Sequence, residues 1–168
     1  MLLAVSETLT RADHQTHRRY PFEVPADCSG LTIRVRYSPK YLSAEESRPL
    51  IEAAVASQAA TVAPPLMEHW RRSYLALPAD LRLGNLLTPS LDDARGAYRG
   101  AGHRHAPEQE WLLREAVTPP GLIPGPLLQG TWTLTITVHT LVSAACDLSI
   151  QIGAETASSD PSAVRRSA

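Results

Sequence analysis

Apolar and polar residues alternate strictly in three segments of the chain, residues 31–37, 131–139 and 146–152. Four further segments alternate less regularly and are also strand candidates, namely residues 2–10, 19–24, 81–91 and 109–117. A period of two residues is typical of a strand that buries one face and exposes the other. A few small residues separate the last two regular segments, which predicts an antiparallel hairpin. The pattern therefore predicts a mainly β fold, an antiparallel jelly-roll-like β-sandwich.

Residues 43–77 follow a different period, because their apolar residues recur at spacings of three and four. This spacing is typical of amphipathic helices. The apolar set consists of Leu50, Ile51, Val55, Val62, Leu66, Met67, Trp70 and Tyr74. The proline pair at 64–65 ends a first helix and can open a second one. The segment is therefore predicted to be a helical hairpin inserted between strands.

The length of 168 residues is that of one domain. We expect a single β-sandwich domain over residues 1–153, with the helical insertion at about 43–77. Residues 154–168 are small and polar, and we expect them to form a disordered tail. Residues 94–107 and 118–130 are rich in turn formers and are predicted to be long loops.

Charge and composition exclude several classes of protein. The 16 basic residues balance 17 acidic ones, which argues against a nucleic-acid-binding module. No apolar run approaches the roughly 20 residues of a membrane span, and the apolar start is too short for a signal peptide. Two cysteines are too few for a disulfide framework or a thiolate metal site. We expect a cytoplasmic protein that binds neither nucleic acid nor membrane.

Proline- and glycine-rich phrases stand at the boundaries of the expected strands. They are HRRYPFEVP at 17–25, RYSP at 36–39, LLTPSLD at 86–92, GAYRGA at 96–101 and TPPGLIPGPLLQGTW at 118–132. Together they resemble the N-terminal β-sandwich module of PHP-type metallohydrolases of the CehA/McbA kind. The resemblance covers roughly residues 17–39 and 86–152 and leaves the helical segment without a counterpart. In that family the metal-binding chemistry resides in a PHP domain that follows the module. The resemblance thus implies an accessory domain without its enzyme.

His103 and His105 form the one tight pair of histidines. A His-x-His pair on a strand places both rings on one face and can hold a divalent metal ion. No strand is predicted before this pair, and Glu108 and Glu110, the nearest carboxylates, would reach it only if the chain folded back. A solvated loop is the simpler interpretation, so no metal ligand and no cofactor is assigned.

Basic residues gather in the same predicted loop. If the loop is compact, Arg95, Arg99, Arg104 and the two histidines would form a patch that can hold a phosphate or a carboxylate through forked hydrogen bonds. The alternative is that Arg99 pairs with Asp92 or Asp93 and pins the loop. The candidate ligand-binding residues are Arg99, His103, Arg104 and His105.

Two functions from different classes remain. The sequence contains neither a Gly-x-Ser-x-Gly elbow nor a phosphate-binding Gly-x-x-x-x-Gly-Lys loop, so no catalytic residue is assigned. We expect a non-catalytic interaction or assembly module that forms a homo-oligomer through the helical hairpin or binds another protein. The alternative is a divalent-metal-dependent hydrolase, or a protein that binds a sugar or phosphate at the 95–105 loop.

Overall fold

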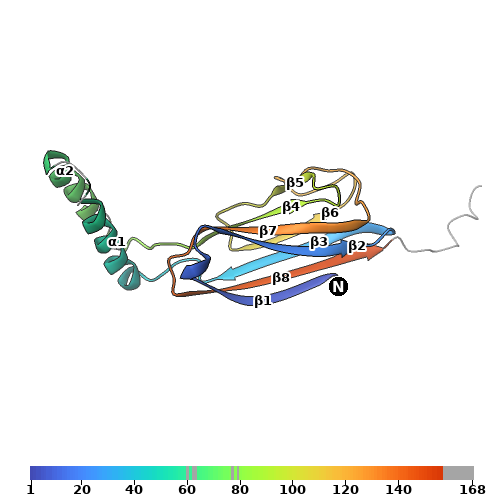
Figure 1. The fold of residues 1–168 in the computed structure, drawn as a ribbon, viewed down its shortest axis with the longest axis horizontal. Coiled ribbons are helices and arrows are strands. Elements are labelled where there is room, and N and C mark those ends of the chain that lie inside the picture. The colour runs from blue at the N-terminus through green and yellow to red at the C-terminus, as the bar shows by residue number, and fades with distance from the viewer. Residues whose placement is uncertain (60, 62–63, 77, 79, 157–168) are drawn as a thin grey trace, which may run out of the picture.

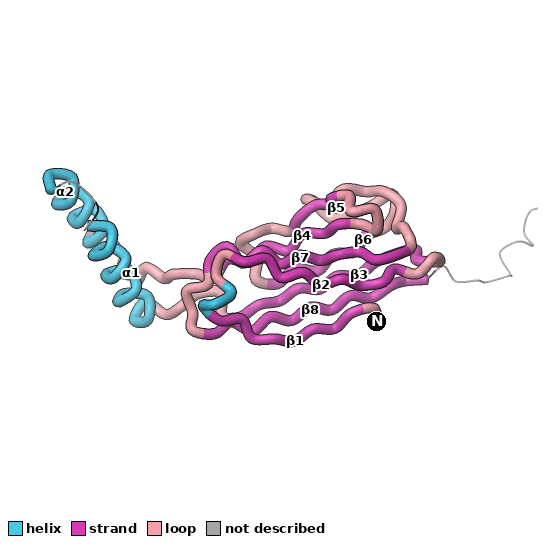
Figure 2. The backbone as a smooth tube through the Cα atoms, in the orientation of Figure 1, coloured by secondary structure: helices cyan, strands magenta, loops and turns pink. Residues whose placement is uncertain are grey.

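The computed structural model describes residues 1–59, 61, 64–76, 78 and 80–156 (Figure 1). Its elements in chain order are β1 (Leu3–Thr10), the 3₁₀ helix η1 (Arg11–Asp13), β2 (Thr16–Val24), β3 (Cys28–Ser38), α1 (Ala44–Ala59), α2 (Pro64–Leu75), β4 (Leu86–Asp92), β5 (Tyr98–Ala101), β6 (Glu108–Leu113), β7 (Gly130–Thr140) and β8 (Ala145–Thr156). The strands form one body and the two α-helices lie beside it (Figure 2).

The strands form two four-stranded sheets, in the orders β1-β8-β3-β6 and β2-β7-β4-β5. Every neighbouring pair for which the register is known runs antiparallel. The prediction of a mainly β, antiparallel fold is confirmed. The three strictly alternating segments lie within β3, β7 and β8, which are the long inner strands of the two sheets.

Alternation along these strands builds the core. On β3, β7 and β8, the residues that point inward include Ile33, Trp132 and Ile150, and each is fully buried. The core cluster draws on both sheets, so it fills the space between them. No residue of α1 or α2 belongs to this cluster within the described chain. The sandwich therefore closes its core without the helices.

Several boundaries predicted from the sequence are wrong. The strand expected at 81–91 begins only at Leu86, and the strand expected at 19–24 already begins at Thr16. Residues 98–101 were expected to lie in a loop, but they form β5, which pairs with β4 through a bulge. The strand expected at 109–117 ends at Leu113. The expected tail begins too early, because β8 continues to Thr156. A register with β1 and β3 decides where β8 ends, and local composition does not report that register. Residues 157–168 of the expected tail lie outside the described part.

We call α1 and α2 together the arm, and Figure 1 shows it projecting from one end of the sandwich. Hydrogen bonds between the two chain segments at its base hold it there. Leu42 N donates to Leu83 O at 2.9 Å, and Asn85 N donates to Lys40 O at 2.9 Å. Leu83 N donates to the buried Ser47 Oγ at 2.9 Å. The base of the arm is therefore fixed to the sandwich, while the helices themselves lie outside its core.

Candidate functional site

Arg99 lies on β5 and its side chain is turned inward, with 5% of the residue exposed. Its guanidinium donates three hydrogen bonds to backbone carbonyls of one loop: Nε to Ile123 O at 3.1 Å, Nη2 to Gly125 O at 3.0 Å and Nη1 to Pro126 O at 2.9 Å. Three carbonyls within four residues thus converge on one buried cation. Arg99 holds the 118–130 loop against the sandwich.

Asp93 is the carboxylate nearest to this cation, with 3.9 Å between Arg99 Nη1 and Asp93 Oδ2. Asp93 Oδ1 accepts hydrogen bonds from the backbone N–H groups of Arg95 and Ala97, at 2.9 and 3.0 Å. The same carboxylate therefore shapes the turn before β5 and faces the Arg99 guanidinium. Arg99 thus lies beside an aspartate, as one of the two interpretations expected, but the loop that its guanidinium holds is 118–130 and not its own.

His103, Arg104 and His105 occupy the turn between β5 and β6, and all three are exposed. The ring centroids of the two histidines are 5.6 Å apart. His103 Nδ1 accepts a hydrogen bond from the backbone N–H of His105 at 3.3 Å. Across the described residues, no hydrogen bond or ion pair joins this turn to the side chain of Arg99. The four candidate residues thus divide into one buried structural cation and one exposed turn.

The two carboxylates considered for a metal site have other partners. Glu110 Oε1 lies 2.8 Å from Arg34 Nη2, and Glu108 Oε1 lies 2.9 Å from Arg36 Nε. The hydrogen bond between Arg34 and Glu110 raises the pKa of the arginine and lowers the pKa of the carboxyl. Within the part of the chain that the structure describes, no three His, Cys, Asp or Glu side chains are placed to share a metal ion.

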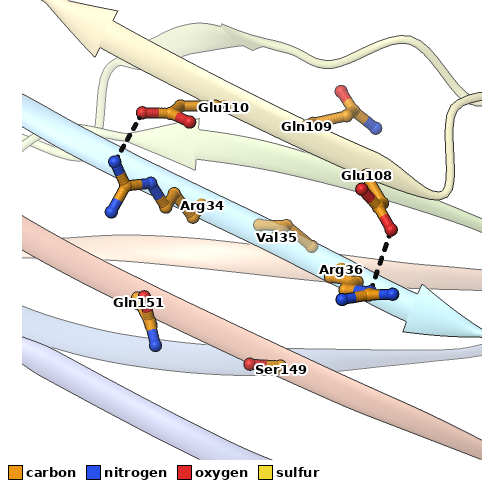
Figure 3. A pocket seen from close by; sticks show the side chains of 8 residues that line it. All are labelled: Arg34, Val35, Arg36, Glu108, Gln109, Glu110, Ser149 and Gln151. Carbon is orange, nitrogen blue, oxygen red and sulfur yellow. Dashed lines mark hydrogen bonds and ion pairs between the residues drawn. The ribbon is translucent and has the colours of Figure 1, made fainter.

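These two ion pairs cross from β3 to β6 and frame a hollow on the outer face of their sheet (Figure 3). The hollow measures about 420 Å³. It is lined by Arg34, Val35, Arg36, Glu108, Gln109, Glu110, Ser149 and Gln151. The lining carries two guanidinium and two carboxylate groups, so its formal charges cancel and it offers both hydrogen-bond donors and acceptors. All four charged side chains are more than half exposed, and exposed ion pairs contribute little to stability.

Sequence reasoning did not single out this ion-pair ladder. A signal was present. Arg34 and Arg36 stand two residues apart within the strand expected at 31–37, and Glu108 and Glu110 stand two residues apart at the beginning of the strand expected at 109–117. Only the register of β3 against β6, in which Arg34 opposes Glu110 and Arg36 opposes Glu108, brings the charges together.

A row of threonines lies on one face of β7, where every second residue is Thr131, Thr133, Thr135 and Thr137. In the structure, two of these hydroxyls contact side chains of β2. Thr131 Oγ1 donates to a carboxylate oxygen of Glu23, and Thr137 Oγ1 lies 3.0 Å from His17 Nδ1. The row is therefore part of a hydrogen-bonded sheet surface.

A charged cluster joins the edge strands β1 and β2, which belong to different sheets. Glu7 accepts a hydrogen bond from Tyr20 Oη and from Arg18 Nη2, the latter at 2.9 Å. Arg18 Nη1 also lies 3.6 Å from Asp13 Oδ1. Burial raises the pKa of Tyr20, and its hydrogen bond to Glu7 acts in the same direction. The cluster links the two sheets at this side of the sandwich.

Neither the scan against family models nor the search of curated proteins finds a match to this chain. In the described residues, neither α-helix combines the length and the apolar character that a membrane crossing requires.

Proposed function

We propose that this chain is a non-catalytic interaction and assembly module, in which a jelly-roll-like sandwich presents a helical hairpin to another protein chain. The observation that carries the proposal is the position of the arm outside the core. A segment that does not contribute to the core of its own domain needs another reason to be helical.

The energetics of short helices support this interpretation. Isolated helices shorter than about 12–15 residues are marginal in water, and most helical stability in proteins comes from packing an apolar face. The arm consists of helices of 16 and 12 residues that contact each other. Its apolar side chains are incompletely covered, and Leu66 is 62% exposed. Docking onto a further surface would supply the missing packing.

We propose that this surface belongs to a second copy of the chain. Homo-oligomers with closed symmetry are the commonest assemblies of soluble proteins, and a hairpin can pack against its own counterpart. Met67 is partly exposed in the single chain and is a candidate contact. The side chain of Trp70, another member of the apolar set of this segment, lies outside the described residues.

The strand order supports the finer description of the sandwich as a jelly roll. The chain pairs β1 with β8, β2 with β7, β3 with β6 and β4 with β5, as a long antiparallel ribbon does when it is rolled up. We also propose, on the sequence phrases given above, that the module is related to the accessory domain of PHP-type metallohydrolases. Both the jelly-roll fold and the relation to an accessory domain agree with a role in presenting the arm and in assembling protein chains.

Sedimentation equilibrium at micromolar concentration tests the proposal. The intact chain is expected to have twice or a higher multiple of its monomer mass of 18.3 kDa. A variant in which a short Gly/Ser linker replaces the arm is expected to be monomeric and still to unfold cooperatively, since the core closes without the helices. A monomeric intact chain would overturn the proposal.

A further inference from the structure

Charged residues on the arm lie on both sides of an uncharged stretch that includes its far tip. On α1 they are Glu45, Glu46, Arg48 and Glu52, and on α2 they are Glu68, Arg71 and Arg72. Residues 53–67 contain no charged residue. In Figure 1, the end of α1 and the start of α2 lie at the far tip, and the start of α1 lies nearest the strands. We call the uncharged stretch, residues 53–67, the distal half of the arm, and we call the charged remainder, which begins on α2 at Glu68, the basal half.

Two ion pairs satisfy most of the basal charges within their own helices. Arg48 Nε lies 3.4 Å from Glu52 Oε1 on α1, and Arg72 Nε lies 3.1 Å from Glu68 Oε1 on α2. Glu46 accepts hydrogen bonds from the backbone N–H and the hydroxyl of Ser43 at the start of α1. The basal half is thus a solvated surface on which most charged groups have partners within the same chain.

The distal half presents apolar side chains. Leu66 is 62% exposed, and Val55 and Met67 are partly exposed. We define the distal face as residues 53–58 of α1 together with Leu66 and Met67 of α2. Apart from Ser57 and Gln58, it consists of Ala, Val, Leu and Met.

We infer that the second copy of the chain binds at this distal face, which rests on the proposed function and specifies its interface. In a twofold contact the same patch meets itself, so residues near the axis face their own counterparts. A charged residue there would meet a like charge, whereas an uncharged apolar face is complementary to itself. The distal face satisfies this condition and the basal half does not.

Contact at the tips has a consequence for the assembly. The two sandwiches would be held apart by their basal halves, and the outer faces of their sheets would stay open. The contact would also be nearly insensitive to salt, because screening acts on interactions between charges. An interface built from the basal charges would instead weaken as the ionic strength rises.

Matched substitutions separate the two halves. Leu66→Glu adds a carboxylate to the distal face, and Ser73→Glu adds the same group at an exposed position on the basal half of α2. Analytical ultracentrifugation would measure the dissociation constant of each variant, and far-UV circular dichroism would measure its helix content. We expect Leu66→Glu to raise the dissociation constant at least 10-fold and Ser73→Glu to change it by less than threefold. The wild-type constant is expected to change by less than threefold between 50 and 500 mM NaCl.

The outcomes distinguish this inference from the proposed function. If the intact chain is monomeric, the proposed function fails and the inference fails with it. If the intact chain is oligomeric but Ser73→Glu weakens it as much as Leu66→Glu, or salt dissociates it, the distal face is not the interface and the proposed function stands. Loss of helix content in Leu66→Glu would leave the salt series of the wild-type chain to decide between the two halves.

Discussion

The guanidinium of Arg99 lies 5.1 Å from the centroid of the Trp132 ring, and both side chains are buried. Such a cation–π contact is strongest where water is excluded. Trp132 Nε1 donates a hydrogen bond to Leu128 O at 2.7 Å, while the Arg99 guanidinium donates hydrogen bonds to three backbone carbonyls within residues 123–126. The 118–130 loop is therefore held at two points by neighbouring side chains from β5 and β7.

Replacing Arg99 should be costly. Arg99→Met keeps most of the aliphatic part of the side chain, but it leaves three carbonyls without their donor and Asp93 without its nearby cation. Removing one partner from a buried charged network costs about 3–5 kcal/mol. Urea unfolding should show a loss of that size in the free energy of unfolding. Arg104→Met, on the exposed turn, should change it by no more than about 0.5 kcal/mol. Equal effects of the two variants would contradict the structural role of Arg99.

The two faces of β7 should differ in the same experiment. Trp132 is fully buried, and truncating a buried Trp to Ala costs about 3–5 kcal/mol. Thr135 points to the other face and is partly exposed. Thr135→Ala should therefore cost less than half as much as Trp132→Ala. A comparable loss from both substitutions would mean that Thr135 also contributes to the buried core.

Two glycines provide a further matched pair. Gly100 has a φ of +114°, and a Cβ on it would lie 2.2 Å from Gly121 O. Gly100→Ala should destabilise the protein by at least about 2 kcal/mol, because the neighbouring atom is backbone and cannot turn away. Gly153 lies in β8 with no atom within 4 Å of an added Cβ. Gly153→Ala should stabilise the strand by about 0.5–1 kcal/mol. Thermal unfolding should show a lower melting temperature for Gly100→Ala and a higher one for Gly153→Ala than for the wild type.

The elements that the sequence predicted correctly are those that bury one face and expose the other. On β3, Ile33 and Val35 are buried while Arg34 and Arg36 are exposed, so alternation reports the strand directly. β5 gives no such pattern, because it has four residues and Gly100 has no side chain to bury. Its pairing with β4 depends on backbone contacts that local composition does not encode.

The candidate site was predictable only where partners are close in the sequence. Asp93 stands six positions before Arg99, so their pairing could be considered in advance. The three carbonyl acceptors lie 24 to 27 positions away, in a loop whose path depends on the finished fold. The pairing of Arg34 with Glu110 spans 76 positions and requires the register of two strands. The pattern of residues along the chain does not specify which distant strands pair or in what register they do so.

The two cysteines should react differently with a thiol reagent. Cys146 is fully buried, and burial raises its pKa to about 11, so it stays a protonated thiol at neutral pH. Cys28 is partly exposed, although burial also raises its pKa. The thiolate is the reactive form. At pH 8, the native chain should react with Ellman's reagent at one thiol, slowly, and the second should appear only in denaturant. Cys28→Ser should abolish the native reaction, and rapid titration of both thiols would contradict the burial of Cys146.

Stability should fall at high pH, and Cys146 should contribute to the fall. Its ordinary pKa is 9.0, whereas burial raises the pKa to about 11 in the folded chain. Between these values the unfolded chain releases a proton that the folded chain keeps, so the free energy of unfolding decreases as the pH rises from 9 to 11. Burial raises the pKa of Tyr20 as well, which adds a decrease of the same sign above pH 10. Chemical unfolding at pH 8, 9, 10 and 11 should therefore give a falling series for the wild type. The slope between pH 9 and 10 should be shallower in Cys146→Ala. This variant loses packing, which lowers its free energy of unfolding at every pH, but it has no thiol to ionise. An unchanged slope in that interval would show that the Cys146 thiol ionises alike in the folded and unfolded chains.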